Sequence, residues 1–246
     1  MEIFATADAW IALLTLAALE IVLGIDNIVF ITILAGKLPK EDQLKARRLG
    51  LAVALISRLA LLATLSWVIK LTAPLFTVLG QEISGRDLIL LGGGLFLIAK
   101  ATFEIYDKVE AAHPAAQAAA TQRVVSMASI ITQIMFLDLV FSLDSVITAV
   151  GMVEHLSIMV IAVIIAVVVM MIFAGPVGNF VDRHPSIKIL ALSFLVMIGV
   201  LLVAEGLDQH VPKGYVYFGM AFSLGIELIN MRYRKHREQL DQPTEM

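Results

Sequence analysis

The chain has 246 residues, of which 59% are hydrophobic and only 16% charged, and its formal net charge is −3. Soluble globular domains are nearer half apolar and a quarter charged, so this composition would leave large apolar patches facing water. It therefore indicates an integral membrane protein and argues against a cytosolic enzyme. The small net charge and the lack of a basic recognition motif argue against nucleic-acid binding. The absence of cysteine excludes disulfide frameworks, thiolate metal sites and thiol nucleophiles.

Long apolar runs predict an all-α, polytopic membrane bundle of about seven transmembrane helices. At roughly 20 residues per span, seven helices with short loops use most of the available length. Helices are expected because backbone amides in hydrocarbon must find their partners within the segment. In chain order the expected spans are 10–34, 51–72, 87–106, 127–152, 157–176, 188–206 and 214–231.

The connecting segments predict a single transmembrane domain over about residues 1–232. Residues 107–126 are rich in Ala and Gln, which favours a cytoplasmic connecting loop. The segment DRHPSIK places Pro185 and Ser186 at the start of a helix. Residues 233–246 are interpreted as a charged, solvated cytoplasmic tail.

The lysine and arginine residues predict the orientation of the chain. If the N-terminus lies outside, thirteen of the eighteen Lys and Arg residues fall on the cytoplasmic side and three in outer loops. Only Arg58 and Lys100 then lie inside spans. Cytoplasmic loops are enriched in these residues, so the distribution favours an N-out, C-in chain with an odd number of spans. An N-in chain is the weaker alternative.

Two segments of the chain resemble each other. They are LEIVLGIDNIVFI at 19–31 and LDLVFSLDSVITA at 137–149. The match pairs Glu20 with Asp138 and Asp26 with Asp144, each 118 residues apart. Because three spans separate the copies, they cross the membrane in opposite directions, which is typical of an inverted-topology repeat.

The expected repeat has three helices in each copy and one helix appended after the second. Repeat one covers about 8–106 and repeat two about 127–206, with the extra span at about 214–231. A weaker match pairs Glu104 with Glu205. Chance similarity between two apolar helices is the alternative interpretation.

The repeated acids lie at depths where charge is costly. Glu20 and Asp138 are expected near the midplane, roughly 15 Å from the nearest end of their spans. Asp26 lies about 9 Å further towards the cytoplasm, and Asp144 about as far towards the outside. Each acid facing lipid would cost on the order of 3 kcal/mol, so we expect all four to face the bundle interior. Unwinding at Gly24 and Ser142 would let both acids of one helix address one cavity.

These acids predict a site for a hard divalent cation. Carboxylates, amides and hydroxyls suit Mg²⁺, Ca²⁺ or Mn²⁺, and the spans hold no clustered His that would favour zinc or copper. The predicted metal ligands are Glu20, Asp26, Asn27, Asp138 and Asp144. Further candidates for supporting contacts are Gln133, Ser142, Ser145, Thr148, Glu104, Glu205 and Arg58. The metal would be a transported substrate, so no permanently bound cofactor is expected, and a proton could replace the ion when it leaves.

Other interpretations of the same charges stay open. The acids could be protonated, or could pair with Arg58 and merely hold helices together. Arg58 could be the counter-ion of the site without metal, or its long side chain could snorkel to the interface. Lys100 and Glu104 have the spacing of a local ion pair within a helix. Glu205 could line a vestibule or lie solvated at the interface.

Five segments carry a resemblance to a known family. They are LEIVLGIDNIVFI, ISRLALL, LGGGLFLIAKATFE, FLDLVFSLDSVITAVGM and VPKGYVYFGMAFSLGIELIN. They resemble the TerC family of integral membrane proteins over about residues 8–232, above all its compact bacterial inner-membrane branch. The resemblance implies a multi-pass bacterial inner-membrane protein of the wider lysine-exporter-like superfamily, whose members are associated with tellurite resistance and, in several bacteria, with manganese export. The family's motif acids correspond to Glu20, Asp26, Asp138 and Asp144, with Asn27 beside the first pair.

The favoured function is export of a divalent cation, most simply Mn²⁺, by alternating access along these acids. Proton exchange or the membrane potential could drive it. The alternative is a non-transporting membrane partner in metal or tellurite stress, or in membrane-protein insertion, that docks through the basic segment MRYRKHR. An enzyme is not expected, because the chain has no HExxH, no GxSxG and no His/Cys nucleophile arrangement. The coupling ion and the oligomeric state are not predicted.

Overall fold

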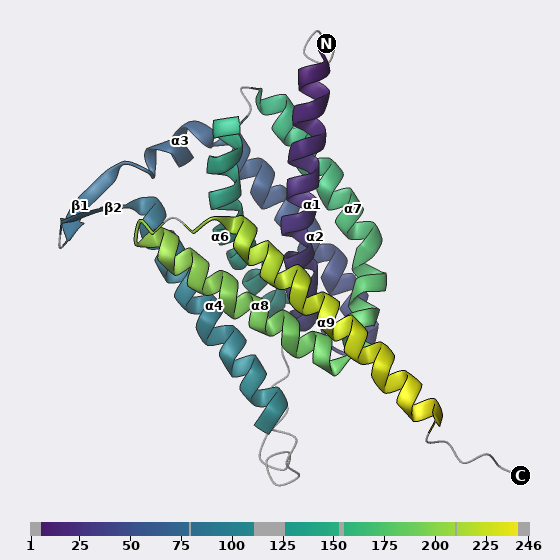
Figure 1. The fold of residues 1–246 in the computed structure, drawn as a ribbon. Helices are drawn as coiled ribbons and strands as arrows, with labels where there is room; N and C mark the ends of the chain where they lie inside the picture. The colour runs from purple at the N-terminus through teal and green to yellow at the C-terminus, as the bar shows by residue number, and fades with distance from the viewer. Residues whose placement is uncertain (1–5, 79, 111–125, 153–154, 210, 241–246) are drawn as a thin grey trace, which may run out of the picture.

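A computed structural model describes residues 6–78, 80–110, 126–152, 155–209 and 211–240, and this part of the chain is almost entirely helical (Figure 1). The elements are α1 (Ala7–Ala35), α2 (Lys40–Ala63), α3 (Leu65–Lys70), β1 (Pro74–Val78), β2 (Gln81–Ser84), α4 (Gly85–Glu110), α6 (Met127–Met152), α7 (Leu156–Arg183), α8 (Pro185–Gly206) and α9 (Lys213–Leu240). The architecture confirms the predicted all-α, polytopic membrane class.

Five of the described helices are long and apolar enough to cross a membrane, namely α1, α4, α6, α7 and α8. Helices α2 and α9 are also long, at 24 and 28 residues, but both carry several charged side chains. Their charged side chains lower their mean hydropathy, so these two helices are not among the five candidates despite their length. A total of seven spans therefore stays a prediction.

The span expected at 51–72 is wrong as a single helix. Helix α2 ends at Ala63, Thr64 leaves the helical conformation, and the six-residue α3 follows. The chain then forms an antiparallel hairpin of β1 and β2, which the sequence did not predict. Its turn includes Gly80 at φ 84°, a left-handed conformation that suits glycine because it has no Cβ.

The predicted start of α8 matches the structure, whereas α4 and α9 extend further than predicted. Helix α8 begins at Pro185, as predicted, with proline at a first-turn position where no backbone donor is needed. Helix α9 continues to Leu240, so the beginning of the predicted tail is helical. Helix α4 runs on to Glu110, and most of the predicted loop, residues 111–125, lies outside the described residues.

The expected unwinding at Gly24 and Ser142 is wrong, because α1 and α6 are continuous helices through both positions. Gly24 instead allows α1 and α7 to approach closely. A Cβ at Gly24 would overlap the side chain of Met170. The small residue therefore serves helix packing, as small residues commonly do between membrane helices.

The helices pack reciprocally between the two halves of the chain. Helix α1 packs mainly against α7, α2 against α6, and α4 against α8. The first helix of each predicted repeat thus meets the second helix of the other, and the two third helices meet each other. A pair of inverted repeats would give this arrangement, although the repeat itself stays a prediction from the sequence.

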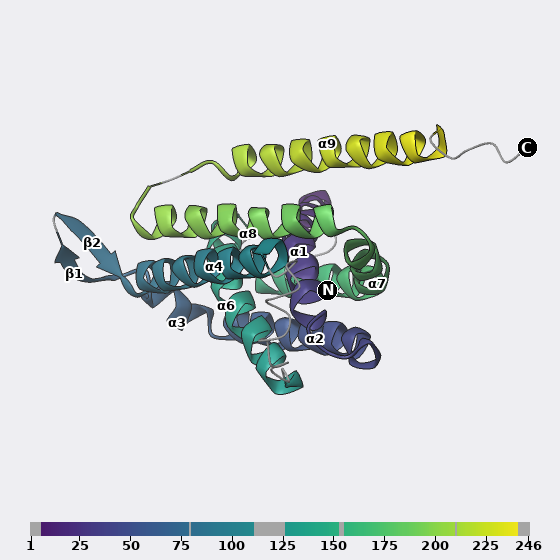
Figure 2. The same cartoon turned by 90° about the horizontal axis from the view of Figure 1, so that it is seen from below.

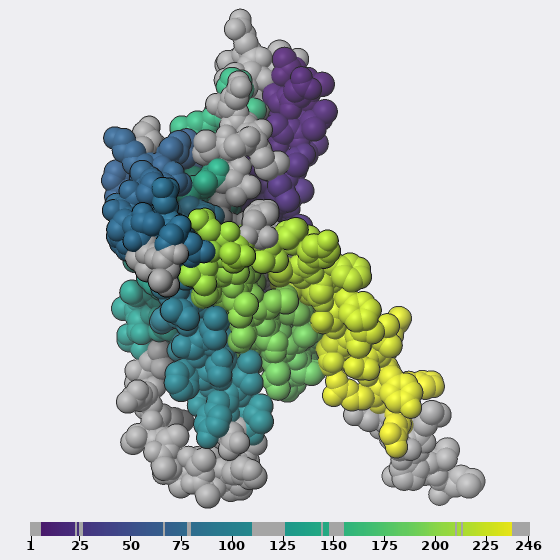
Figure 3. Space-filling view, turned by 60° about the vertical axis from the view of Figure 1, so that its left-hand side comes forward, coloured from purple at the N-terminus to yellow at the C-terminus, as the bar shows by residue number. Residues whose placement is uncertain are grey.

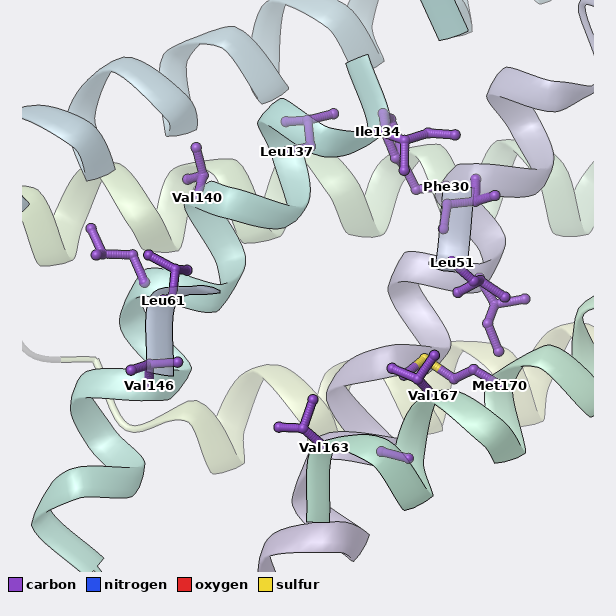
Figure 4. Packing of buried hydrophobic residues seen from close by; sticks show 14 of the residues in the cluster. Phe30, Leu51, Leu61, Ile134, Leu137, Val140, Val146, Val163, Val167 and Met170 are labelled. Carbon is purple, nitrogen blue, oxygen red and sulfur yellow. The ribbon is translucent and has the colours of Figure 1, made fainter. Parts of the chain in front are cut away.

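The buried core lies where the crossed pairs meet (Figure 4). In this view Phe30 of α1 lies beside Ile134 of α6, and Leu51 of α2 lies below them, just above Val167 and Met170 of α7. Helix α9 lies outside this core. It packs against α8 and stands away from the other helices of the bundle (Figure 2).

Close packing of α4 on α8 yields a test of the fold. A Cβ at Gly94 would lie 2.6 Å from the carbonyl oxygen of Gly199, whereas a Cβ at Gly92 has nothing within 4 Å. We expect Gly94→Ala to destabilise the bundle by about 1–3 kcal/mol, because backbone would have to move. Gly92→Ala should be neutral or stabilising, by up to about 1 kcal/mol, because alanine favours helix. Thermal unfolding of the purified protein in detergent measures both, and equal effects would contradict this packing.

Candidate functional site

Helix α2 buries a stripe that contains two arginines. Arg47, Leu51, Ala54 and Arg58 recur at the spacing of one helical face, and all are buried. The stripe faces α6 and α7, the helices against which α2 packs. Both guanidinium groups therefore enter the interior of the bundle.

Arg58 lies between the two acids that the internal repeat pairs. Its Nε and Nη2 donate to Oδ1 of Asp138 on α6 at 3.1 and 3.0 Å, and its Nη1 forms an ion pair with Oε2 of Glu20 on α1. Arg58 is 3% exposed, Asp138 4% and Glu20 7%. Three helices are thereby joined by one guanidinium, and Arg58 does not snorkel to the interface.

Two hydroxyl groups complete the surroundings of Asp138. Ser57 Oγ lies 2.8 Å from Oδ2 of Asp138, and Ser142 Oγ lies 3.3 Å from the same atom. Ser142 comes one helical turn after Asp138 on α6, while Ser57 reaches it from α2. The guanidinium of Arg58 thus donates to one oxygen of Asp138, Oδ1, and the two hydroxyl groups contact the other, Oδ2. We call Glu20, Ser57, Arg58, Asp138 and Ser142 the central cluster.

The charges of the central cluster do not cancel when both acids are ionised. Arginine stays protonated in proteins, so one positive and two negative charges leave a net charge of −1. A buried uncompensated charge costs several kcal/mol, because the low dielectric interior cannot solvate it. With both acids ionised, the central cluster would therefore hold one negative charge that Arg58 alone does not neutralise.

The other predicted acids pair with cations at the two ends of the bundle. Glu104 forms ion pairs with Lys37 and, at 3.4 Å, with Lys100, at the end predicted to face the cytoplasm. At the opposite end Glu205 lies 4.0 Å from Arg86. The structure therefore does not bring Glu104 or Glu205 to Arg58.

The remaining predicted ligands are distributed differently. Asn27 is buried on α1, two helical turns from Glu20 and therefore on the same face of that helix. Gln133 and Ser145 hydrogen-bond within α6, to Ser129 and to the carbonyl of Ser142, and do not join the central cluster. The side chains of Asp26, Asp144 and Thr148 lie outside the described residues.

Among the described residues, no three His, Asp or Glu side chains come close enough together to hold a metal ion. The two central carboxylates are instead held around Arg58. Arg58 contacts Oε2 of Glu20 and Oδ1 of Asp138 in this arrangement.

Two polar contacts of α2 were not predicted. Ser57 joins the central cluster, and Arg47 donates to Asp182 of α7 at 2.6 Å. A Cβ at Gly178 would overlap the Arg47 guanidinium, so this glycine makes room for the arginine. The signal available in the sequence was the spacing of eleven residues between Arg47 and Arg58, which places both on one helical face.

Removing Arg58 tests whether the central cluster is coupled. We expect Arg58→Gln to destabilise the protein by about 3–5 kcal/mol, because two buried acids lose their counter-ion. Adding Asp138→Asn should recover part of the lost stability, because one of the two unpaired negative charges is removed. Chemical unfolding in detergent measures the double-mutant cycle, with exposed Arg48→Gln on the same helix as the control. Additive losses in the double variant would contradict the coupling.

Comparison with known proteins identifies the family. The model of the integral membrane protein TerC family matches residues 5–241. A UPF0053 protein of Haemophilus influenzae is 57% identical over 234 residues, which are 95% of this chain and 98% of that protein. The UPF0053 inner membrane protein YgdQ of Escherichia coli K12 is 57% identical over 91% of this chain and 93% of its own length.

A larger relative contains a similar region within a longer chain. The UPF0053 inner membrane protein YoaE of Escherichia coli K12 is 52% identical over 96% of this chain but only 45% of its own length. No solved structure matches. The named relatives and the five apolar helices together indicate a multi-pass inner-membrane protein. The chain belongs to the TerC family of integral membrane proteins.

Proposed function

We propose that this chain is a transporter rather than an enzyme, and that it exports a divalent cation, most simply Mn²⁺, by alternating access. The observation that carries the proposal is the buried contact of Arg58 with both Glu20 and Asp138. Ionisable residues deep in a membrane are costly and are commonly retained for ion pathways.

Arg58 is proposed to be a resident counter-ion that competes with the transported cation. With both acids ionised and no metal bound, the central cluster carries a net charge of −1. A divalent cation would be neutralised by the two carboxylates and would repel the guanidinium. Entry of the metal would therefore displace Arg58, and release of the metal would allow Arg58 to return.

The donor set supports a hard cation. Oxygens of Glu20 and Asp138 contact the guanidinium, and the hydroxyls of Ser57 and Ser142 contact Asp138. None of these described residues supplies a sulfur or imidazole ligand. Such oxygen ligands suit Mg²⁺, Ca²⁺ and Mn²⁺. Within this class, Mn²⁺ is proposed from the family resemblance, and Asp26 and Asp144 remain the predicted ligands towards the two faces.

Ion pairs at both ends are proposed to act as gates. At the end predicted to face the cytoplasm, Arg47 of α2 contacts Asp182 of α7 at 2.6 Å. At the other end, Arg86 of α4 approaches Glu205 of α8. Each pair joins helices from different predicted repeats, so relative movement of the repeats would separate one pair or the other.

Loss of the central acids should abolish transport. In proteoliposomes, we expect Glu20→Gln/Asp138→Asn to reduce Mn²⁺ flux at least about tenfold, because neither a charged ligand nor an exchangeable proton remains. The control is Glu41→Gln/Asp107→Asn, which makes the same chemical changes at exposed helix ends and should retain flux. Elemental analysis of the vesicles measures the Mn²⁺ moved.

Two results would contradict the proposal. Full flux in the Glu20/Asp138 variant would show that the central acids are not on the ion path. No Mn²⁺ flux in wild-type vesicles, under either an imposed proton gradient or a membrane potential, would instead favour the non-transporting partner role.

A further inference from the structure

A basic cleft lies at one end of the groove between α8 and α9. Its volume is about 660 Å³, and its walls come from the α7–α8 corner and the C-terminal half of α9. The cations that line it are Arg183, Arg232, Arg234 and Lys235, and His184 lies beside them. In the predicted topology this cleft lies at the cytoplasmic surface of the membrane.

The charge of the cleft is strongly unbalanced. None of the described residues that line it is acidic. On α9, Glu227 accepts a hydrogen bond from Arg234 at 2.8 Å and is also hydrogen-bonded to Ser186. On the α7 side, Asp182 is already held by Arg47 and Lys188. The cleft therefore keeps an excess of positive charge for an anionic group.

The same groove becomes apolar further along the two helices. A second cavity, of about 220 Å³, lies between α1, α8 and α9 and is lined by Leu190, Ala191 and Phe194 on one side and Met220, Ala221 and Leu224 on the other. Helix α9 leaves this space because it packs only lightly against α8. In Figure 3 the yellow C-terminal half of α9 projects beyond the green surface of α8.

We propose that the α8–α9 groove binds one anionic phospholipid, with the phosphate headgroup in the basic cleft and an acyl chain in the apolar cavity. The two cavities follow one another along the same pair of helices, as the two ends of a lipid would. Basic pockets between transmembrane helices on the cytoplasmic side commonly bind acidic headgroups. The lipid joins α9 to the bundle where protein contacts are sparse.

Native mass spectrometry of the purified protein in mixed micelles tests this site. The probes are dioleoyl phosphatidylglycerol, dioleoyl phosphatidylcholine, dihexanoyl phosphatidylglycerol and inorganic phosphate. The variant Arg183→Gln/Arg232→Gln/Lys235→Gln removes three cations of the cleft. The matched control Lys40→Gln/Lys45→Gln/Arg48→Gln removes three exposed cations from the start of α2, at the same predicted face.

We expect wild-type protein to retain one dioleoyl phosphatidylglycerol in preference to phosphatidylcholine. The cleft variant should bind it roughly 100-fold more weakly, because each cation near the surface contributes about a factor of five. The control triple should bind as wild type does. Ala221→Trp should weaken the long-chain lipid but not the dihexanoyl form, while exposed Ala60→Trp should change neither.

Three outcomes would overturn the proposal. If the cleft and control triple variants weaken lipid binding equally, binding depends on the general charge of the surface and not on the cleft. Equal retention of phosphatidylcholine and phosphatidylglycerol would remove the role of charge. Displacement of the lipid by equimolar inorganic phosphate, together with no effect of Ala221→Trp, would show an anion site without an acyl chain. Unfolding temperatures measured without lipid separate these outcomes from misfolding of a variant.

Discussion

Burial of charge in an apolar bundle is the constraint on which the rest of this structure depends. A lone carboxylate or guanidinium in hydrocarbon would cost several kcal/mol, so each must find a partner of opposite charge. Glu20, Arg58 and Asp138 meet this requirement together, and in doing so they join α1, α2 and α6. The helices are therefore fixed to one another by the same side chains that could receive a cation.

The reciprocal packing of the helices explains how distant segments build one site. Helices α2 and α6 belong to different predicted repeats and cross at the centre, where the backbone of α2 brings Ser57 and Arg58 to Asp138. Ion pairs at the two ends link other helices in a similar way. Among the described residues, ion pairs thus occur at the centre and at both ends of the bundle.

Much of this arrangement could be predicted from the sequence because hydrocarbon restricts what a chain can do. Apolar runs of span length must be helices, and a rare acid inside one must face inward. The paired positions of Glu20 and Asp138 followed from the repeat, and Pro185 marked a helix start. These features depend on local pattern, which one chain displays directly.

The rest depends on contacts between segments far apart in the chain. Arg58 had two interpretations, because its depth alone does not say which helix it faces. Ser57 was not predicted, since a hydroxyl in a helix usually bonds its own backbone. No periodic pattern of apolar residues in the sequence marks the break at Thr64 or the hairpin that follows it. The expectation of unwinding at Gly24 failed because a glycine also serves close packing, here against Met170.

The central claim is that Arg58 and the transported cation compete for the same two carboxylates. Thermal unfolding of purified Arg58→Gln, titrated with Mn²⁺, tests it most directly, because a ligand that binds the folded state raises its unfolding temperature. The account predicts that Mn²⁺ stabilises Arg58→Gln at lower concentrations than it stabilises wild type, and that adding Glu20→Gln and Asp138→Asn removes the effect. Stabilisation of wild type that is weakened by loss of Arg58 would contradict it.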